Sequence, residues 1–232
     1  AMGGSPQHAL LGLAIPTDGP SLAELEAMLD GLEEEAERYG VTLVGGDTCG
    51  SQSGLVLAVT LLGRVAGGRA LRRSGAKPGD SLWVTGRLGA SAAGLLALER
   101  GLGPAAAWPA EVPRPGWLGA GEERAIQAAI QVHLTPIPRL RAGQALVGCA
   151  SAMIDVSDGV ASDSRHLATE SEVTVRVLAA QIPIDPSALV MARLTGREPL
   201  DLALRGGEDY ELLFTAAADP RPVLTAAAPE LP

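Results

Sequence analysis

The chain has 232 residues, 47% of them hydrophobic, with a formal charge of −9, which is enough apolar content for the core of one large domain or two small ones. The sequence contains no run of Lys or Arg, its apolar stretches are short and interrupted, and it shows no secretory signal pattern, so we expect neither nucleic acid nor membrane as a partner and a cytoplasmic location. With 29 Gly and 3% aromatic residues, composition favours an α/β protein over a β-sandwich.

The first part of the chain predicts a strand, a helix and two further strands, at residues 10–15, 22–36, 41–44 and 53–64. The helix prediction is specific, because Ser21 and Glu24 form a capping-box pattern and apolar residues keep helical spacing until Gly40. Composition shifts near residue 68, at Gly67-Gly68 and a basic group that follows. We therefore place a domain boundary there, giving domains 1–68 and 69–232.

Gly45-Gly46-Asp47-Thr48 separates the last two of these strands and predicts a glycine turn. Two glycines allow the backbone to come close to a ligand, and an acid directly behind them can hold a cation that bridges phosphates. The alternative is an ordinary hairpin turn with Asp47 exposed.

Strands and helices alternate in the second domain. Strands are expected at 81–85, 152–155, 174–178 and in the apolar run ending at Phe214, and helices at 91–100, 122–132, 140–149, 160–169 and 187–194. The loop 86–89 could cradle an anion at a helix N-terminus, but structural packing is the favoured interpretation. His133 lies in a proline-stiffened bend and is either catalytic or a hydrogen-bonding loop residue.

The stretch around Asp155 carries the most specific chemistry. Three apolar residues lead into Asp155, Ser157 and Asp158 follow, and Gly159 allows a turn into a helix. Two carboxylates three positions apart at a strand end can converge on one cation, and magnesium usually takes one or two protein carboxylates. The alternative is that both acids are solvated turn residues, one of which caps the next helix.

A third turn, Gly206-Gly207-Glu208-Asp209, also leads into an apolar strand, so Glu208 and Asp209 are expected at its mouth. Three acid-rich or Gly-rich turns beside strands are typical of metal-assisted phosphoryl transfer. In that chemistry positioning and charge neutralisation supply most of the catalysis, and no protein nucleophile is required.

Five stretches of the sequence resemble, in order, the signatures of the thiamine-monophosphate kinase family: Gly45 to Thr48, Arg73 to Asp80, His133 to Arg139, Met153 to Gly159 and Gly206 to Leu212. The resemblance implies a two-domain α/β (α+β) fold of the aminoimidazole ribonucleotide synthetase type. It also implies transfer of the γ-phosphoryl group of ATP to thiamine phosphate, which gives thiamine diphosphate, with several Mg²⁺ ions and a homodimer.

The resemblance assigns roles to individual residues. ATP contacts are implied at Gly46, Asp47, Arg73 and Ser157. Magnesium ligands are implied at Asp47, Asp155 and Asp158, with Asp158 as the residue most directly concerned with catalysis. Glu208 is implied as a contact to thiamine phosphate.

Against the family pattern, we expect an acid-bearing segment to be missing before Ala1 and a strand-bearing segment after Pro232. Residues 1–68 would then be a truncated ATP-binding and dimerisation domain, and 69–232 the C-terminal α/β domain. Two alternatives stay open. One is another ATP-using member of the same superfamily, and the other is a catalytically silent fragment that only binds nucleotide.

Overall fold

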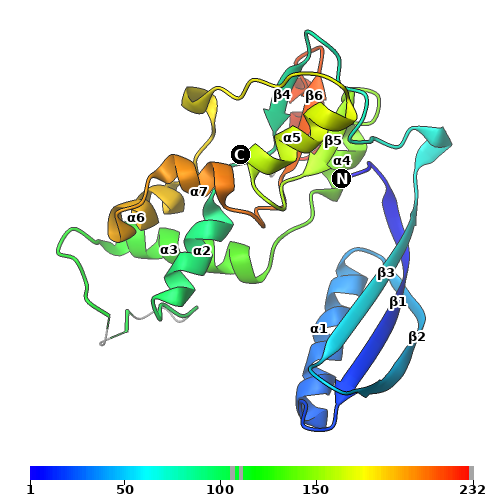
Figure 1. Ribbon diagram of the computed structural model, residues 1–232, viewed down its shortest axis with the longest axis vertical. Coiled ribbons are helices and arrows are strands. Elements are labelled where there is room, and N and C mark those ends of the chain that lie inside the picture. The colour runs from blue at the N-terminus through cyan, green and yellow to red at the C-terminus, as the bar shows by residue number, and fades with distance from the viewer. Residues whose placement is uncertain (105–107, 110–111, 230–232) are drawn as a thin grey trace. The chain divides into compact units, whose positions relative to one another are not determined.

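Figure 1 shows the computed structural model of the chain, which describes residues 1–104, 108–109 and 112–229. The residues divide into two compact units, Gly4–Gly68 and Ala1–Gly3 with Arg69–Pro232. The first three residues belong with the second unit because the backbone N–H of Leu71 donates to the carbonyl oxygen of Met2 (3.1 Å). Within the described ranges, no helix is both long enough and apolar enough to cross a membrane.

The unit Gly4–Gly68 is a three-stranded sheet with one helix. Strand β1 (Ser5–Pro16) is central, β2 (Thr42–Ser51) runs parallel to it, and β3 (Val56–Arg64) runs antiparallel on its other side. Helix α1 (Leu22–Arg38) connects β1 to β2 and lies along the sheet in Figure 1.

The predicted capping box of α1 is confirmed. The backbone N–H of Glu24 donates to Ser21 Oγ (3.3 Å), and the backbone N–H of Ser21 donates to Glu24 Oε2 (2.8 Å). These two bonds satisfy donors that a helix start otherwise leaves unpaired, which explains why this helix was readable from sequence.

The predicted glycine turn is wrong, and so is the alternative of a hairpin, because Gly45-Gly46-Asp47 lies inside β2 and β2 pairs with β1. The pairing register shifts beside Gly45, opposite the step from Ala9 to Leu10. A Cβ at position 46 would lie 2.0 Å from the carbonyl oxygen of Leu11. The glycines therefore serve a bulge and a close backbone approach within a strand.

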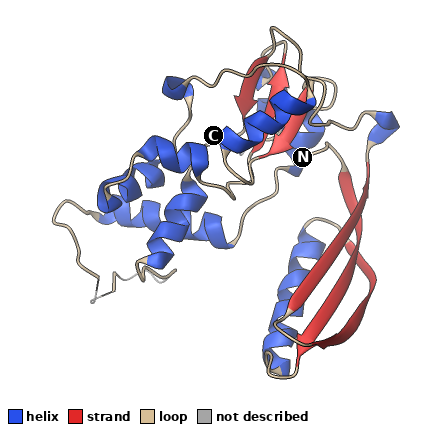
Figure 2. Ribbon diagram, viewed as in Figure 1, coloured by secondary structure: helices blue, strands red, loops and turns tan. Residues whose placement is uncertain are grey.

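The second unit contains another three-stranded sheet, drawn in red in Figure 2. Strand β6 (Leu212–Ala216) lies between β4 (Ser81–Val84) and β5 (Ala152–Asp155) and is antiparallel to both. All five residues of β6 are buried, which explains why four of them are apolar and why apolar and polar residues do not alternate. Helix α5 (Val160–Glu170) follows β5.

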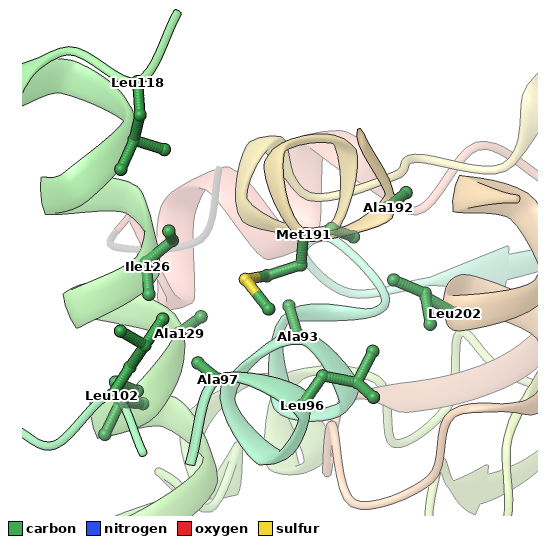
Figure 3. Packing of buried hydrophobic residues seen from close by; sticks show 12 residues of the cluster. Ala93, Leu96, Ala97, Leu102, Leu118, Ile126, Ala129, Met191, Ala192 and Leu202 are labelled. Atoms are coloured by element: carbon green, nitrogen blue, oxygen red, sulfur yellow. The ribbon is translucent and has the colours of Figure 1, made fainter. Parts of the chain in front are cut away.

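Four helices of the second unit, α2 (Ala90–Glu99), α3 (Ala120–Leu134), α6 (Pro186–Thr195) and α7 (Pro199–Arg205), share one apolar core. Figure 3 shows Met191 of α6 between the small residues of α2 and Ile126 of α3. The remaining helical segments are η1 (Ala66–Gly68), α4 (Leu140–Ala145), η2 (Ala179–Gln181) and α8 (Arg221–Ala227).

Two further expectations for this unit are wrong. His133 lies in the last turn of α3 and not in the bend that follows. Residues 174–178 pair with no strand among the described residues, although Val and Thr favour strands. Strand propensity takes effect only when a partner edge is in reach, and this segment instead lines a cavity of about 670 Å³ beside β4.

Candidate functional site

The turn after β5 is organised by Asp163, one helical turn inside α5. Asp163 Oδ2 accepts hydrogen bonds from the backbone N–H groups of Ser157 (3.0 Å) and Asp158 (3.1 Å). The alternative that Asp155 or Asp158 caps the next helix is wrong, because the N-cap residue of α5 is Gly159 and no side chain caps this helix. Asp155 is half-buried and Asp158 is exposed. Both carboxylates lie at the end of β5, and neither caps the helix that follows.

Asp163 also belongs to a candidate cation site that sequence reasoning missed. Ligand atoms of Asp158, Asp163 and His166 all lie within 4.8 Å of one another. Asp163 is 1% exposed, and its Oδ1 atom has no hydrogen-bond partner in the described part of the chain. Burial raises the pKa of the Asp163 carboxyl, and the charges of Asp158 and Asp155 raise it further. A buried oxygen with an unused lone pair beside a second carboxylate fits a divalent cation.

A signal for this group was present in the sequence. Asp163 and His166 are three residues apart on a predicted helix, a spacing that places both on the face of the helix that continues the acidic turn.

The turn Gly206–Tyr210 packs directly on the turn after β5. The backbone N–H of Glu208 donates to the carbonyl oxygen of Ser157 (2.9 Å), and the N–H of Tyr210 donates to that of Val156 (3.0 Å). A Cβ at position 207 would lie 2.3 Å from the Ser157 carbonyl oxygen, so only glycine allows this approach. The structure thus brings together two of the three turns that the sequence singled out.

The backbone of this turn is strained around a buried acid. Glu208 and Tyr210 both have positive φ, 66° and 49°, which costs a non-glycine residue on the order of 1 kcal/mol each. Between them, Asp209 accepts hydrogen bonds from the backbone N–H groups of Gly89 (2.7 Å) and Ser91 (3.0 Å) at the start of α2. The N-terminus of α2 is thus occupied by a protein carboxylate, and burial raises the pKa of Asp209 to about 6 although these bonds act against the rise.

We expected both acids to be accessible at the start of β6. This expectation is wrong for Asp209, whose side chain is buried against the start of α2, and it holds for Glu208. The Glu208 side chain is 55% exposed and lines a cavity of about 460 Å³, which we call the Glu208 pocket. His133, Arg197, Asp201 and Arg205 line it as well.

Three carboxylates at the two turns influence the pKa of one phenol, that of Tyr210. Burial raises the pKa of Tyr210, and the charges of Glu208, Asp155 and Asp158 raise it further. This common influence indicates a single acidic region at the ends of β5 and the Gly206–Tyr210 turn, suited to a cation or a cationic ligand.

Glu211 connects the bend after α3 to the end of the Gly206–Tyr210 turn through hydrogen bonds. Arg139 donates to both of its carboxylate oxygens, from Nε (3.0 Å) and from Nη2 (2.6 Å), and Thr85 Oγ1 donates to Oε2 (2.6 Å). Glu211 is buried, so its charge requires these partners. The pair joins two of the stretches that the sequence had matched to the same family.

The remaining predicted residues lie elsewhere. The carbonyl oxygen of Arg73 accepts a hydrogen bond from Ser171 (3.0 Å), directly after α5. The backbone N–H of Met153 in β5 donates to the carbonyl oxygen of the neighbouring Arg72 (2.8 Å), so the backbone at Arg73 runs beside β5 and the C-terminal end of α5. Gly46 and Asp47 belong to the other unit, where they lie in β2 opposite Leu11 and Gly12, with Asp47 exposed.

The chain is similar to known proteins along most of its length. Residues 1–65 match the N-terminal domain family of AIR synthase related proteins. The chain is 40% identical over 216 residues to the thiamine-monophosphate kinase of Salmonella typhimurium, an alignment that covers 93% of this chain and 59% of that protein. The chain thus spans about 60% of the length of the curated relatives that it matches.

Two solved structures have the same fold. The complex of AaThiL with AMPPCP and TMP has a TM-score of 0.80 and 33% identity, covering 95% of this chain and 66% of that one. The thiamine-monophosphate kinase of Stenotrophomonas maltophilia K279a has a TM-score of 0.80 and 36% identity, covering 100% of this chain and 68% of that one. The two-domain α/β fold is thereby confirmed, and the chain belongs to the thiamine-monophosphate kinase family.

Proposed function

We propose that the chain uses ATP and magnesium to phosphorylate thiamine phosphate, giving thiamine diphosphate. The observation that carries the proposal is the packing of the Gly206–Tyr210 turn on the turn after β5, which groups Asp155, Asp158 and Glu208 in one acidic region. The complex of the related AaThiL with AMPPCP and TMP supports the same pair of ligands.

Magnesium would be held by Asp155 and Asp158, with Asp47 as a ligand on the ATP side. The donors fit this ion, since carboxylate oxygens are its preferred protein ligands and Asp163 adds a buried oxygen to which no described residue donates. His166 would favour a softer ion over magnesium, so we leave it out of the proposed set. Bound there, the ion would neutralise phosphate charge.

The other proposed roles belong to side chains of this chain. Glu208 binds the cationic part of thiamine phosphate, while Ser157, Gly46 and Arg73 contact ATP. A phosphate oxygen of thiamine phosphate is itself the nucleophile toward the γ-phosphorus, and ADP leaves as the bond from that phosphorus to the β,γ-bridging oxygen breaks. The protein therefore has to hold both phosphates in line and neutralise their charge, and it needs no nucleophile of its own.

We also propose a homodimer in the cytoplasm, where ATP is available. Its support is the exposed apolar surface of the smaller unit, where Val59 and Leu61 of β3 are 54% and 58% exposed. Surfaces of this kind are usually covered by a partner. Light scattering of the purified chain tests the dimer.

The activity is tested with the purified chain, ATP, magnesium and thiamine phosphate, by following thiamine diphosphate with ³¹P NMR. We expect product, and we expect Asp158→Asn to lower the rate at least 100-fold, because a neutral amide cannot balance developing phosphate charge. Asp30→Asn, an exposed position on α1, is the control. ATP binding without product would favour the silent nucleotide binder, and an unchanged rate in Asp158→Asn would remove that residue from the site.

A further inference from the structure

The contact between α2 and α3 places a histidine beside the acidic region. Gly94 of α2 packs so closely on α3 that a Cβ there would lie 2.2 Å from the carbonyl oxygen of Ala129 and 2.9 Å from Cβ of His133. Because position 94 has no side chain, the last turn of α3 can rest against the first turn of α2. His133 is thereby held next to Ser91.

Ser91 is held in place by its surroundings. It is fully buried, and its backbone N–H donates to the buried carboxylate of Asp209 (3.0 Å). Ser91 Oγ lies 2.9 Å from Nδ1 of His133. The imidazole is therefore anchored to a group that cannot move without breaking the start of α2.

The same ring nitrogen faces Glu208. His133 Nδ1 is 3.7 Å from Glu208 Oε2, and the two side chains are 16% and 55% exposed. We assign the hydrogen to Nδ1, because Ser91 Oγ can accept it there and its positive end also attracts the Glu208 carboxylate, whereas a lone pair on Nδ1 would repel that carboxylate. Glu208 otherwise has the freedom of an exposed side chain, because its backbone alone is fixed by the bond to Ser157.

His133 and Glu208 both line the Glu208 pocket. Its lining includes the apolar Ala92, Leu95 and Leu96 and carries acids as well as arginines. The thiamine moiety matches this combination of apolar surface and carboxylate, because it has a planar cationic thiazolium ring and a second ring that bears an amino group. The His133–Glu208 contact therefore lies within the lining of the pocket, where such a ligand would meet the carboxylate.

We propose that His133 is a positioning residue, which holds the Glu208 carboxylate in the Glu208 pocket to receive the cationic, amino-bearing thiamine moiety of the acceptor substrate. This rests on the proposed function, which supplies thiamine phosphate as that substrate. His133 acts through Glu208 and makes no contact with the transferred phosphoryl group.

The test compares three substitutions that differ in where they leave a hydrogen-bond donor. An Asn side chain places its amide near the position of Nδ1, a Gln side chain reaches past it, and Ala has no donor. We expect His133→Ala and His133→Gln to weaken thiamine phosphate about 10-fold in calorimetric titrations, and His133→Asn to stay within about 3-fold of the parent. The affinity for a non-hydrolysable ATP analogue should change less than about 2-fold in all three. Gln131→Ala, an exposed position on the same helix, is the control.

A double-mutant cycle separates positioning from a structural role. If His133 acts through Glu208, then His133→Ala adds little to the loss caused by Glu208→Gln. Equal losses in both backgrounds, equal losses for both ligands, or no advantage of Asn over Gln would overturn the proposal.

One measurement does not depend on the substrate. The ¹⁵N chemical shift of His133 Nδ1 reports whether that atom carries the hydrogen, and it should change in Glu208→Gln. An unchanged shift contradicts the proposal. A parent chain that does not bind thiamine phosphate contradicts the proposed function instead, so the two failures are distinguishable.

Discussion

Gly94→Ala tests the helix contact on which the candidate site depends. The added Cβ would lie 2.2 Å from the carbonyl oxygen of Ala129, whereas ordinary contacts begin near 3.4 Å, so α3 must move by about 1 Å or α2 must bend. Overpacking of a tight core costs about 1–3 kcal/mol, and the better helix propensity of Ala returns up to about 1 kcal/mol. We expect a net loss of about 1–2 kcal/mol, which lowers the urea midpoint by about 0.5–1 M.

Gly121→Ala in α3 is the matched control, because a Cβ there meets nothing within 4 Å. It should leave stability unchanged or raise it by up to about 1 kcal/mol. The assay is urea unfolding of the whole chain, followed by the fluorescence of Trp108 and Trp117, which pack against the core formed by these helices. Gly94→Ala and Gly121→Ala with equal midpoints would refute the reasoning, since propensity alone would then describe both.

Three other outcomes are expected. Glu208→Gln should weaken thiamine phosphate at least 10-fold more than ATP in separate titrations, because the acid faces the cationic substrate; equal losses would mean that Glu208 only organises its turn. Gly207→Ala should destabilise the chain by about 1–3 kcal/mol in urea unfolding, because its Cβ would lie 2.3 Å from the Ser157 carbonyl oxygen; an unchanged midpoint would contradict the close packing of the two turns. Burial raises the pKa of Asp209 to about 6, above the value near 3.9 of an unfolded chain, so the folded state binds the proton more tightly and the stability from this group is lost as pH rises from about 4 to 6. Asp209→Asn should remove about 2 kcal/mol of that dependence between pH 4.5 and 7, and identical pH profiles would show that Asp209 is not desolvated.

Much of the second unit could be predicted because its signals are local. The apolar run before Asp155 and the one after Glu211 form β5 and β6. A short continuous apolar run indicates a buried strand by itself, so these strands could be predicted without knowing which strands they pair with. The capping box of α1 is likewise complete within four residues.

The errors concern features that depend on distant partners. Gly45-Gly46 resembled a turn, but its meaning is set by the backbone of Leu11, which only the folded sheet brings near. Residues 174–178 have the composition of a strand but pair with no strand in the described structure. Strand propensity shows that a segment can form a strand, but the segment forms one only where a neighbouring strand pairs with it.

The candidate site divides in the same way. Asp155, Asp158 and Glu208 were identifiable as acids in turns, whereas their grouping depends on the bond from the Glu208 N–H to Ser157. Asp163 was missed because a carboxylate inside a predicted helix looks like surface. Only its burial and its unpaired Oδ1 reveal its position.

The most direct test of the central claim is a crystal structure of the chain with a non-hydrolysable ATP analogue, magnesium and thiamine phosphate. The account predicts a magnesium ion about 2.1 Å from a carboxylate oxygen of Asp158, and the amino-bearing ring of thiamine phosphate against Glu208. Thiamine phosphate bound instead in the larger cavity of about 670 Å³ beside β4, against Lys77 and Arg176, would contradict it.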